Sequence, residues 1–335
     1  MKIQKVINKY FQSTSRISFK ACKGGAINQT YLLTRKLNGG KKYYKLQKMN
    51  KIFNTSLMED IEFITKYLVL KKIKTISVVK TLDNHKFVKD GSFWWRMLTY
   101  IPGRVFGAMP SFEHAKKAGK LVGEFHNALF KCKYKLKFKL KNYHNIDYDM
   151  KKLENTLKEN KNTKKHIQLK NTAENILMLY KKFPKNIILP KRIIHNDLKI
   201  SNVIFDKDGT KALSLIDLDT LSYGTMNIEL GDALRSWCMV GGEDTKNVRF
   251  NINIYNSALK GYFSVVKFLT NEEKKSISQG VQLMTLDLAA RFIIDAFNES
   301  YFTLNSLKYK NLFEQNKKRA ENQMKFFEKF TNNFK

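Results

Sequence analysis

The sequence predicts an α+β fold with two lobes, a small antiparallel β-sheet with one helix and a larger, mostly helical lobe. Residues 16–101 contain short alternating apolar and polar runs, separated by turns rich in Gly, Asn and Asp. Residues 111–330 contain long segments with helical periodicity. Pro102-Gly103 breaks the pattern, so we expect an N-terminal lobe of residues 1–102 and a C-terminal lobe of residues 103–335.

The first lobe should begin with a short amphipathic helix, followed by strands over residues 16–21, 28–33 and 42–49. Gly24 and Gly25 lie between the first two strands, and a turn without Cβ atoms lets backbone N–H groups approach phosphate groups. A Gly-Gly turn between strands is more often an ordinary hairpin turn, so this turn alone does not establish a nucleotide site.

The third strand and the helix after it supply further candidates for a nucleotide site. Lys45 and Gln47 share one face of the strand, and either could contact phosphate, although an exposed lysine is equally expected in so basic a protein. Ser56 and Glu59 have the spacing of a capping box for a helix over residues 57–73. Glu59 could therefore close this box or orient the nucleotide. Further strands are predicted over residues 76–82, 85–89 and 93–101.

The second lobe should be built from helices. Ser111 precedes one that ends near Leu129. Residues 131–141 alternate Lys with apolar side chains, which favours a half-buried strand or extended loop over a membrane or nucleic-acid contact. Arg291 and Asp295 stand at i and i+4, so they form either a surface ion pair or a substrate clamp. The other predicted helices are two lysine-rich ones within residues 149–185 and three long ones at 251–268, 272–300 and 312–330.

The strongest functional signal is the segment His195-Asn-Asp197-Leu-Lys-Ile-Ser-Asn202. Its H-x-D-x-x-x-x-N spacing is that of the catalytic loop of kinase-like phosphotransferases. Asp197 is suited to orient an acceptor hydroxyl group and take its proton. A turn rich in Asn and Asp that only caps a helix is the structural alternative.

A predicted hairpin follows this loop and strengthens the interpretation. Two apolar runs, residues 203–205 and 212–216, flank a Gly-containing turn. Asp217 comes at the end of the second run, where kinases place a magnesium-binding aspartate. Asn202 and Asp217 offer the hard oxygen ligands that Mg²⁺ prefers. Farther on, Asp232 could orient the catalytic loop or cap a helix that opens near Gly231.

Composition limits the function classes. The formal net charge is +33, yet only 9 of the 62 basic residues are Arg, which argues against a surface designed for nucleic acid. Such a charge still attracts anionic partners, including ATP. Three scattered cysteines have no metal-ligand spacing, and no run is long enough to cross a membrane. With no apolar signal peptide in residues 1–11, we expect a cytoplasmic protein, which we also expect to be a monomer.

With these segments, the chain resembles the aminoglycoside/choline-kinase-like phosphotransferase superfamily and is most similar to N-acetylhexosamine 1-kinases. The superfamily likeness rests on the segments around Asp197 and Asp217. The segments Asp217–Thr220 and Arg291–Tyr301 point to the sugar-kinase branch. The other landmarks are residues 25–31, 46–50, 57–61, 95–97, 123–125, 143–145 and 231–235.

This resemblance implies a bilobal, protein-kinase-like fold and transfer of the ATP γ-phosphate to the anomeric hydroxyl of GlcNAc or GalNAc. Asp197 would be the base, and Asn202 and Asp217 would hold Mg²⁺. The nucleotide side would use Gly24, Gly25, Asn28, Lys45, Gln47 and Glu59, with His195 and Asp232 supporting the loop. The sugar would meet Arg291 and Tyr301, with Asp295, His144 and Asp219 as lesser candidates.

Three departures from the family pattern bear on these expectations. Ala26 stands where the family loop carries His or another polar residue, and the segment before Tyr301 is one residue shorter. Both affect the acceptor side, so the identity of the sugar stays open. Gln47 stands where related kinases carry a basic residue, which leaves the phosphate-binding side chain unassigned.

Other functions remain possible on the sequence alone. A kinase of choline, ethanolamine, homoserine or an aminoglycoside would use the same chemistry, although cationic acceptors fit poorly with a charge of +33. A catalytically silent, kinase-shaped binding protein is disfavoured because the base and metal positions are all present. A nucleic-acid or membrane-surface binder is disfavoured because no known nucleic-acid motif occurs.

Overall fold

The computed structural model describes residues 2–13, 16–22, 27–184 and 188–334. The chain forms two compact units. The first contains residues 1–104, 131–140 and 204–220, and the second contains residues 105–130, 141–203 and 221–335. The first unit thus ends its main segment two residues beyond the expected boundary at 102 and also takes in two later segments.

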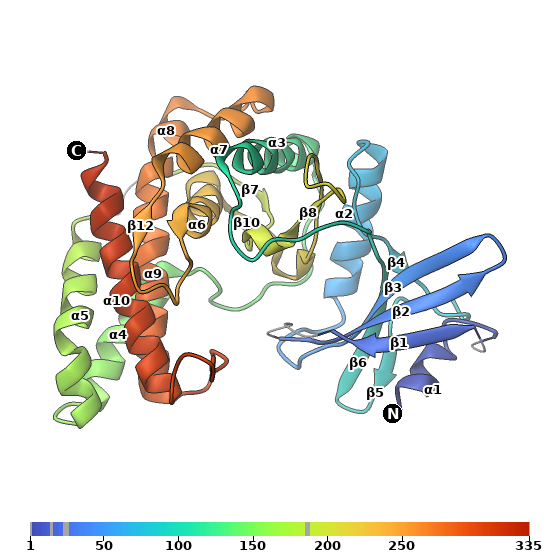
Figure 1. Ribbon diagram of the computed structural model, residues 1–335, viewed down its shortest axis with the longest axis horizontal. Coiled ribbons are helices and arrows are strands. Elements are labelled where there is room, and N and C mark those ends of the chain that lie inside the picture. The colour runs from blue at the N-terminus through green and yellow to red at the C-terminus, as the bar shows by residue number, and fades with distance from the viewer. Residues whose placement is uncertain (1, 14–15, 23–26, 185–187, 335) are drawn as a thin grey trace. The chain divides into compact units, whose positions relative to one another are not determined.

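An antiparallel sheet is the centre of the first unit (Figure 1). Its strands run in the order β1-β2-β3-β6-β4, and β5 pairs with β6. The two predicted strands before residue 90 shrink to β4 and β5, because Thr81 and His85 bond each other across a turn. The strands are β1 (Ile17–Ala21), β2 (Gln29–Leu37), β3 (Gly40–Lys48), β4 (Val78–Val79), β5 (Val88–Asp90) and β6 (Phe93–Thr99).

Two helices accompany this sheet, α1 (Ile3–Ile7) and α2 (Leu57–Leu70). Val6 and Ile7 of α1 are buried in one apolar cluster with residues of β2, β3 and β6. The predicted capping box of α2 is wrong. Ser56 has helical backbone angles (φ −63°, ψ −23°) and makes no cap bond, since a cap residue needs an extended backbone. Glu59 instead pairs with Lys86 at 2.7 Å.

The lysine-rich alternating segment at 131–140 belongs to the first unit as an extended loop. Its lysines are exposed and its apolar side chains are half-buried or buried, as the period of two predicts. Asp60, buried in α2, accepts hydrogen bonds from the Tyr134 hydroxyl (2.9 Å) and from the backbone N–H of Phe138 (2.8 Å). These bonds hold the segment within its own unit, where its apolar side chains are half-buried or buried.

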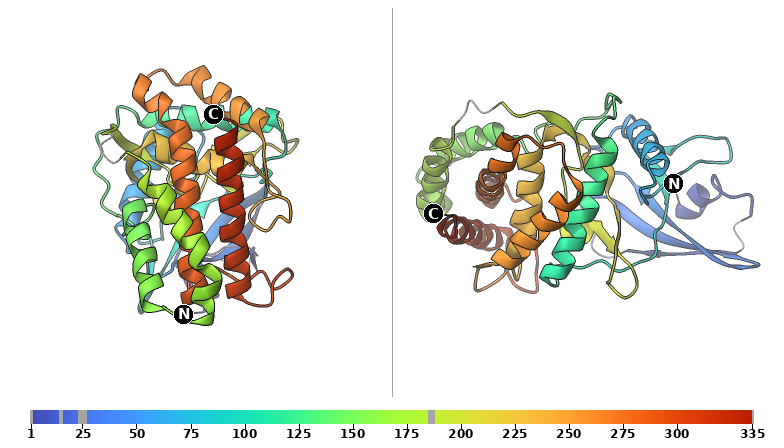
Figure 2. Two further views of the ribbon diagram at one scale, coloured as in Figure 1. Left: turned by 90° about the vertical axis from the view of Figure 1, so that its left-hand side faces the viewer. Right: turned by 90° about the horizontal axis from the view of Figure 1, so that it is seen from above.

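The second unit is mostly helical, and four of its helices run side by side (Figure 2). These are α4 (Ile146–Glu159), α5 (Lys164–Lys181), α9 (Ile277–Asn298) and α10 (Leu312–Asn332). Their facing sides share one large apolar cluster, in which α9 is almost entirely buried. The remaining helices are α3 (Phe112–Leu129), α6 (Met226–Cys238), α7 (Ile252–Val265) and α8 (Asn271–Lys275).

Short strands and turns frame the loop that carries the kinase-like motif. β7 (Lys191–Ile194) pairs antiparallel with β10 (Ser222–Thr225), and β11 (Met239–Val240) pairs with β12 (Arg249–Phe250). The predicted hairpin is confirmed as β8 (Val203–Phe205) and β9 (Ala212–Leu215). Asp206 closes its turn by accepting from the backbone N–H of Thr210 at 2.6 Å. Among the described helices, none combines the length and apolar content needed to cross a bilayer.

Candidate active site

Asp197 is held by its own loop in the second unit. The Asn202 side-chain amide donates to the Asp197 backbone carbonyl at 2.8 Å and to its Oδ2 at 3.0 Å. Lys199 Nζ lies 2.6 Å from the same Oδ2. These bonds fix the carboxylate and turn Oδ1 of Asn202, the acceptor atom of the amide, away from Asp197. Lys199 is a contact that the sequence analysis did not single out.

Glu229 on α6 positions the start of this loop, and the sequence analysis missed it. Its carboxylate accepts from the backbone N–H groups of His195 (2.9 Å) and Asn196 (2.8 Å) and lies 3.1 Å from His126 Nε2. Asn196 has a left-handed backbone (φ 66°), which such bonds stabilise. Burial opposes the charged form, but His126 and the backbone N–H of His195 lower the pKa of Glu229. In the sequence, Glu229 could have been noticed as an acidic residue three positions before Asp232.

Asp232 has a different place from the one predicted. It lies in the middle of α6, which begins at Met226, so it caps no helix. Its Oδ1 accepts from Arg235 Nε (3.2 Å) and Nη2 (2.9 Å), and it lines a cavity rather than bonding the loop. His195 is fully buried, and its backbone N–H ties it to Glu229. Glu229 therefore supplies support of the predicted kind, and a role of Asp232 in orienting the loop stays a prediction.

Asp217 belongs to the first unit and follows β9. Its backbone is left-handed (φ 67°), a costly conformation for a residue other than glycine and one that concentrates at functional sites. Among the described residues, no hydrogen bond or ion pair occupies the Asp217 carboxylate. An amide oxygen at Asn202 and a carboxylate at Asp217 are hard ligands of the kind that fit Mg²⁺. Their convergence with Asp197 stays a prediction.

In the first unit, a buried polar network surrounds Gln47, the residue that stands where related kinases carry a basic side chain. Gln47 lies opposite Arg96 in the β3–β6 pairing, and its Oε1 accepts from Arg96 Nε (3.0 Å) and Nη2 (2.8 Å). Arg96 also pairs with both carboxylate oxygens of Asp219, at 2.7 and 2.8 Å. Burial raises the pKa of Asp219, and the Arg96 guanidinium works against that rise. Arg96 is thus the buried cation that sequence reasoning did not find.

The other nucleotide-side candidates have varied surroundings. Asn28 donates to Asp219 at 3.2 Å and accepts from the backbone N–H of Asn50. Lys45 is half-buried and electrostatically coupled to Asp219. Glu59 is engaged by Lys86. Gly24 and Gly25 lie outside the described residues. Asp219, a candidate for the sugar, is bonded within the first unit and has a structural partner.

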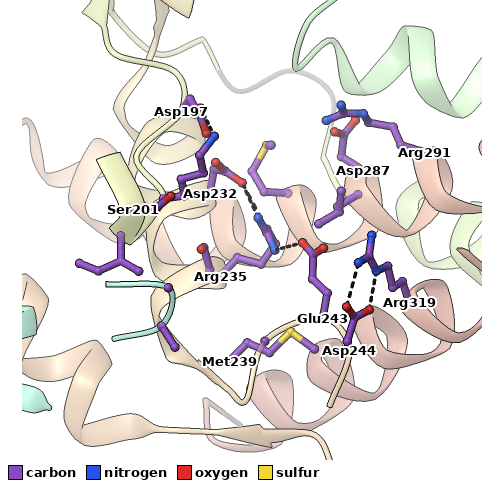
Figure 3. Close-up of a pocket in the computed structure, with 18 of the residues that line it drawn as sticks. Asp197, Ser201, Asp232, Arg235, Met239, Glu243, Asp244, Asp287, Arg291 and Arg319 are labelled. Atoms are coloured by element: carbon purple, nitrogen blue, oxygen red, sulfur yellow. Dashed lines mark hydrogen bonds and ion pairs between the residues drawn. The ribbon is translucent and has the colours of Figure 1, made fainter. Parts of the chain in front are cut away.

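A cavity of about 460 Å³ opens beside Asp197 in the second unit (Figure 3). Five acidic and five basic side chains line it, so it is locally balanced in a protein of net charge +33. Most of the acids are paired with bases: Asp197 with Lys199, Asp232 with Arg235, and Asp244 with Arg319. Glu243 lies 3.9 Å from Arg235. A lining of paired charges presents many hydrogen-bonding groups without a strong net field.

The predicted sugar contacts divide into three groups. Arg291 lines the cavity and donates to the Tyr301 hydroxyl at 2.8 Å, while Tyr301 itself is 59% exposed and lies outside the lining. His144 lines the cavity and bonds Asn196 Oδ1 at 2.9 Å. Asp295 does not pair with Arg291. It accepts from the backbone N–H groups of residues 300–302 and from Asn316, so it fixes the segment that carries Tyr301.

Comparison with known proteins places this geometry in a family. The model of the phosphotransferase enzyme family APH matches residues 18–251. The chain belongs to this family. The match includes Asp197, Asn202 and Asp217, and it confirms the superfamily likeness while leaving the narrower likeness to N-acetylhexosamine kinases open.

Solved structures with the same fold have low sequence identity. An aminoglycoside phosphotransferase from Alicyclobacillus acidocaldarius subsp. acidocaldarius DSM 446 is 14% identical, with a TM-score of 0.66 over 99% of this chain and 96% of that one. An amicoumacin kinase in complex with AMP-PNP, Ca²⁺ and Ami is 16% identical (TM-score 0.65, 97% and 94% covered). A microcompartment-associated aminopropanol kinase is 13% identical (TM-score 0.65, 98% and 97% covered). The phosphotransferase therefore has the predicted kinase-like fold.

Proposed function

We propose that this phosphotransferase moves the γ-phosphoryl group of ATP to a hydroxyl group of a small molecule held in the cavity. The position of Asp197 supports this most directly, since its fixed carboxylate opens onto a cavity of ligand size. Asp197 accepts the hydroxyl proton as the acceptor oxygen bonds to phosphorus and the bond from phosphorus to the ADP oxygen breaks. Positioning and charge neutralisation supply most of the catalysis.

The side chains of the kinase-like motif fit this chemistry. Asn202 Oδ1 and the Asp217 carboxylate would hold Mg²⁺, which neutralises charge on the phosphate oxygens. Lys199 reaches Oδ2 of Asp197 and is 48% exposed, so it can also turn to a phosphate oxygen. The resulting division of tasks gives the loop one base, one metal ligand and one cation within six residues.

We propose an N-acetylhexosamine as the acceptor, phosphorylated at its anomeric hydroxyl. The resemblance of the Arg291–Tyr301 segment to the sugar-kinase branch motivates this choice. Two observations support it. Arg291 lines the cavity and is held by the Tyr301 hydroxyl, and the paired charges of the lining suit a neutral polyhydroxyl ligand better than a cation.

A second candidate is an amine-bearing acceptor such as an aminoglycoside or an amino alcohol. The names of two of the solved relatives, an aminoglycoside phosphotransferase and an aminopropanol kinase, favour it over the sugar. Acidic side chains in the cavity could also receive an ammonium group. A silent binding protein is less well supported, because Asp197, Asn202 and Asp217 are all retained.

Replacing Asp197 tests the chemistry. Asp197→Asn should lower turnover by a factor of about 10²–10⁴, the usual contribution of a general base, while leaving the thermal midpoint nearly unchanged. Asp208→Asn is the matched control, since Asp208 is exposed in the hairpin turn. An Asp197→Asn enzyme with full activity would refute the assignment of the base.

An acceptor panel tests the substrate. Consumption of ATP or GTP with Mg²⁺ should be measured against GlcNAc, GalNAc, glucose, choline, 1-amino-2-propanol and kanamycin, with ³¹P NMR of the product. We expect the two N-acetylhexosamines to give the highest kcat/KM and an anomeric phosphate. A clear preference for choline, 1-amino-2-propanol or kanamycin would establish the second candidate instead. Absence of Mg-nucleotide binding by calorimetry would revive the silent protein.

A further inference from the structure

Two buried carboxyl groups, Asp149 and Asp287, meet beside the cavity and have no part in the mechanism above. Asp287 lies on α9, is fully buried and lines the cavity. Apart from Asp149, no group among the described residues donates a hydrogen bond to either of its carboxylate oxygens. Asp149, in the first turn of α4, is its hydrogen-bonding neighbour. Two ionised carboxylates are both acceptors, so this bond exists only when the pair holds a proton.

The surroundings favour retention of that proton. Burial raises the pKa of Asp287 to about 8, with Asp149 adding to the rise and Arg291 opposing it. Burial also raises the pKa of Asp149. Like charges in contact inside a protein cannot both ionise without a large cost. The pair therefore keeps one proton at neutral pH.

Arg291 lies one helical turn after Asp287, and Figure 3 shows the two side chains together on one wall of the cavity. Its guanidinium also stands over the rings of Tyr143 (5.6 Å) and Tyr301 (5.1 Å). Burial works against the charged form, but Tyr301, Asp287, Tyr143 and Asp149 together raise the pKa of Arg291. The carboxyl pair thus forms part of the surroundings of Arg291, whose side chain lines the cavity.

The other titratable groups near the pair are an ion pair, a neutral imidazole ring and one exposed lysine. Asp232 on α6 faces it, and Arg235 lowers the pKa of Asp232 despite burial, so these two remain an ion pair. His144 faces it from the loop before α4, and burial lowers the pKa of His144, which keeps the ring neutral at pH 7. Lys152 on α4 faces Asp149 from an exposed position. Asp149, Asp287 and Arg291 therefore set the local charge.

We propose that Asp149 and Asp287 form a proton-sharing carboxyl pair that positions Arg291 and selects acceptors by charge. With one proton on the pair and a positive Arg291, the three side chains carry no net charge and suit a neutral, hydroxyl-bearing acceptor. Loss of the proton gives the three side chains a net charge of −1. This charge does not repel a neutral sugar, but it pulls Arg291 from its position. The same charge attracts an acceptor that carries an amine. This proposal rests on the proposed function, since it concerns the acceptor of the same site.

The test compares Asp287→Asn and Asp149→Asn with the surface control Asp208→Asn. KM and kcat should be measured from pH 6 to 10 with GlcNAc and with kanamycin. In the wild type and the control, we expect KM for GlcNAc to rise at least threefold between pH 7 and 9.5. Asp287→Asn cannot lose a proton at this position. Its KM for GlcNAc should therefore stay constant between pH 7 and 9.5, independently of any change in kcat.

An NMR measurement shows whether Asp149 and Asp287 share a proton, and it needs no acceptor substrate. Protein labelled with ¹³C at the aspartate carboxyl carbons should show a resonance that titrates near pH 8 in the wild type and vanishes in Asp287→Asn. Absence of that titration, or a pH profile of KM that is the same in wild type and Asp287→Asn, would overturn the proposal. A panel in which no acceptor reacts would count against the proposed function. The NMR result would still show whether Asp149 and Asp287 share a proton.

Discussion

Glu229 and Asp287 are both buried carboxylates in the second unit, yet their surroundings are opposite. Glu229 receives two backbone N–H groups and lies against His126, and its pKa is lowered. Asp287 has no donor among the described residues other than Asp149, and its pKa is raised to about 8. Because both carboxylates are buried, burial alone does not decide which of them is ionised. The donors aimed at the carboxylate decide it, and they also separate a structural acid from one available to a ligand.

The largest effect of this difference should appear at Glu229. Glu229→Gln replaces one acceptor oxygen by an NH₂ group that faces backbone donors, so we expect a loss of about 3 kcal/mol in the free energy of unfolding. The charged Glu229 stabilises the fold above its ordinary pKa of 4.5, and this contribution is lost as the pH falls through the lowered folded value.

Chemical unfolding at pH 4, 5.5 and 7 measures this loss. The deficit of Glu229→Gln should be greatest at pH 7 and shrink toward pH 4. A variant as stable as the wild type at pH 7 would mean that the bonds to His195 and Asn196 contribute little, and the contrast with Asp287 would lose its basis.

A smaller effect of opposite sign is expected at Asp287. Its folded pKa lies above the ordinary value of 3.8, so the folded state binds more protons than the unfolded state between about pH 4 and 8. Stability contributed by this group falls as the pH rises through that window and levels out above it. Asp287→Asn lacks that loss and should be more stable than the wild type by about 1 kcal/mol at pH 8.

Urea unfolding at pH 5, 7 and 9 measures the sign directly. The stability gained by Asp287→Asn should be largest at pH 9 and smallest at pH 5, whereas the control Asp208→Asn should follow the wild type throughout. Destabilisation of Asp287→Asn at every pH would show that a donor other than Asp149 reaches this carboxylate.

The smallest test applies the same principle to helix caps. Thr270 and Glu273 form a full capping box at α8, whereas Ser56 makes no cap bond at α2 despite the matching sequence. Thr270→Ala should lower the thermal midpoint, in keeping with a cap contribution of about 1 kcal/mol. Ser56→Ala should leave it nearly unchanged. Equal effects of the two substitutions would contradict the assignment of the caps.

The sequence by itself determined the features that depend on neighbours along the chain. The spacing from His195 to Asn202, the hairpin that precedes Asp217 and the periodicity of the long helices each reflect a local geometry that side-chain order alone can encode. The half-burial of the 131–140 loop follows from the same reasoning. Family membership could be inferred because those local segments carry the motif.

The tertiary structure alone decided which polar groups are satisfied. Glu229 meets the catalytic loop across 34 residues, and Arg96 meets Asp219 across 123. The same local pattern, a carboxylate four residues from an arginine, left Asp295 bonded to backbone N–H groups and Asp287 without a backbone donor among the described residues. Hydrogen bonds and burial depend on what the rest of the chain brings to each side chain, and no spacing in the sequence contains that information.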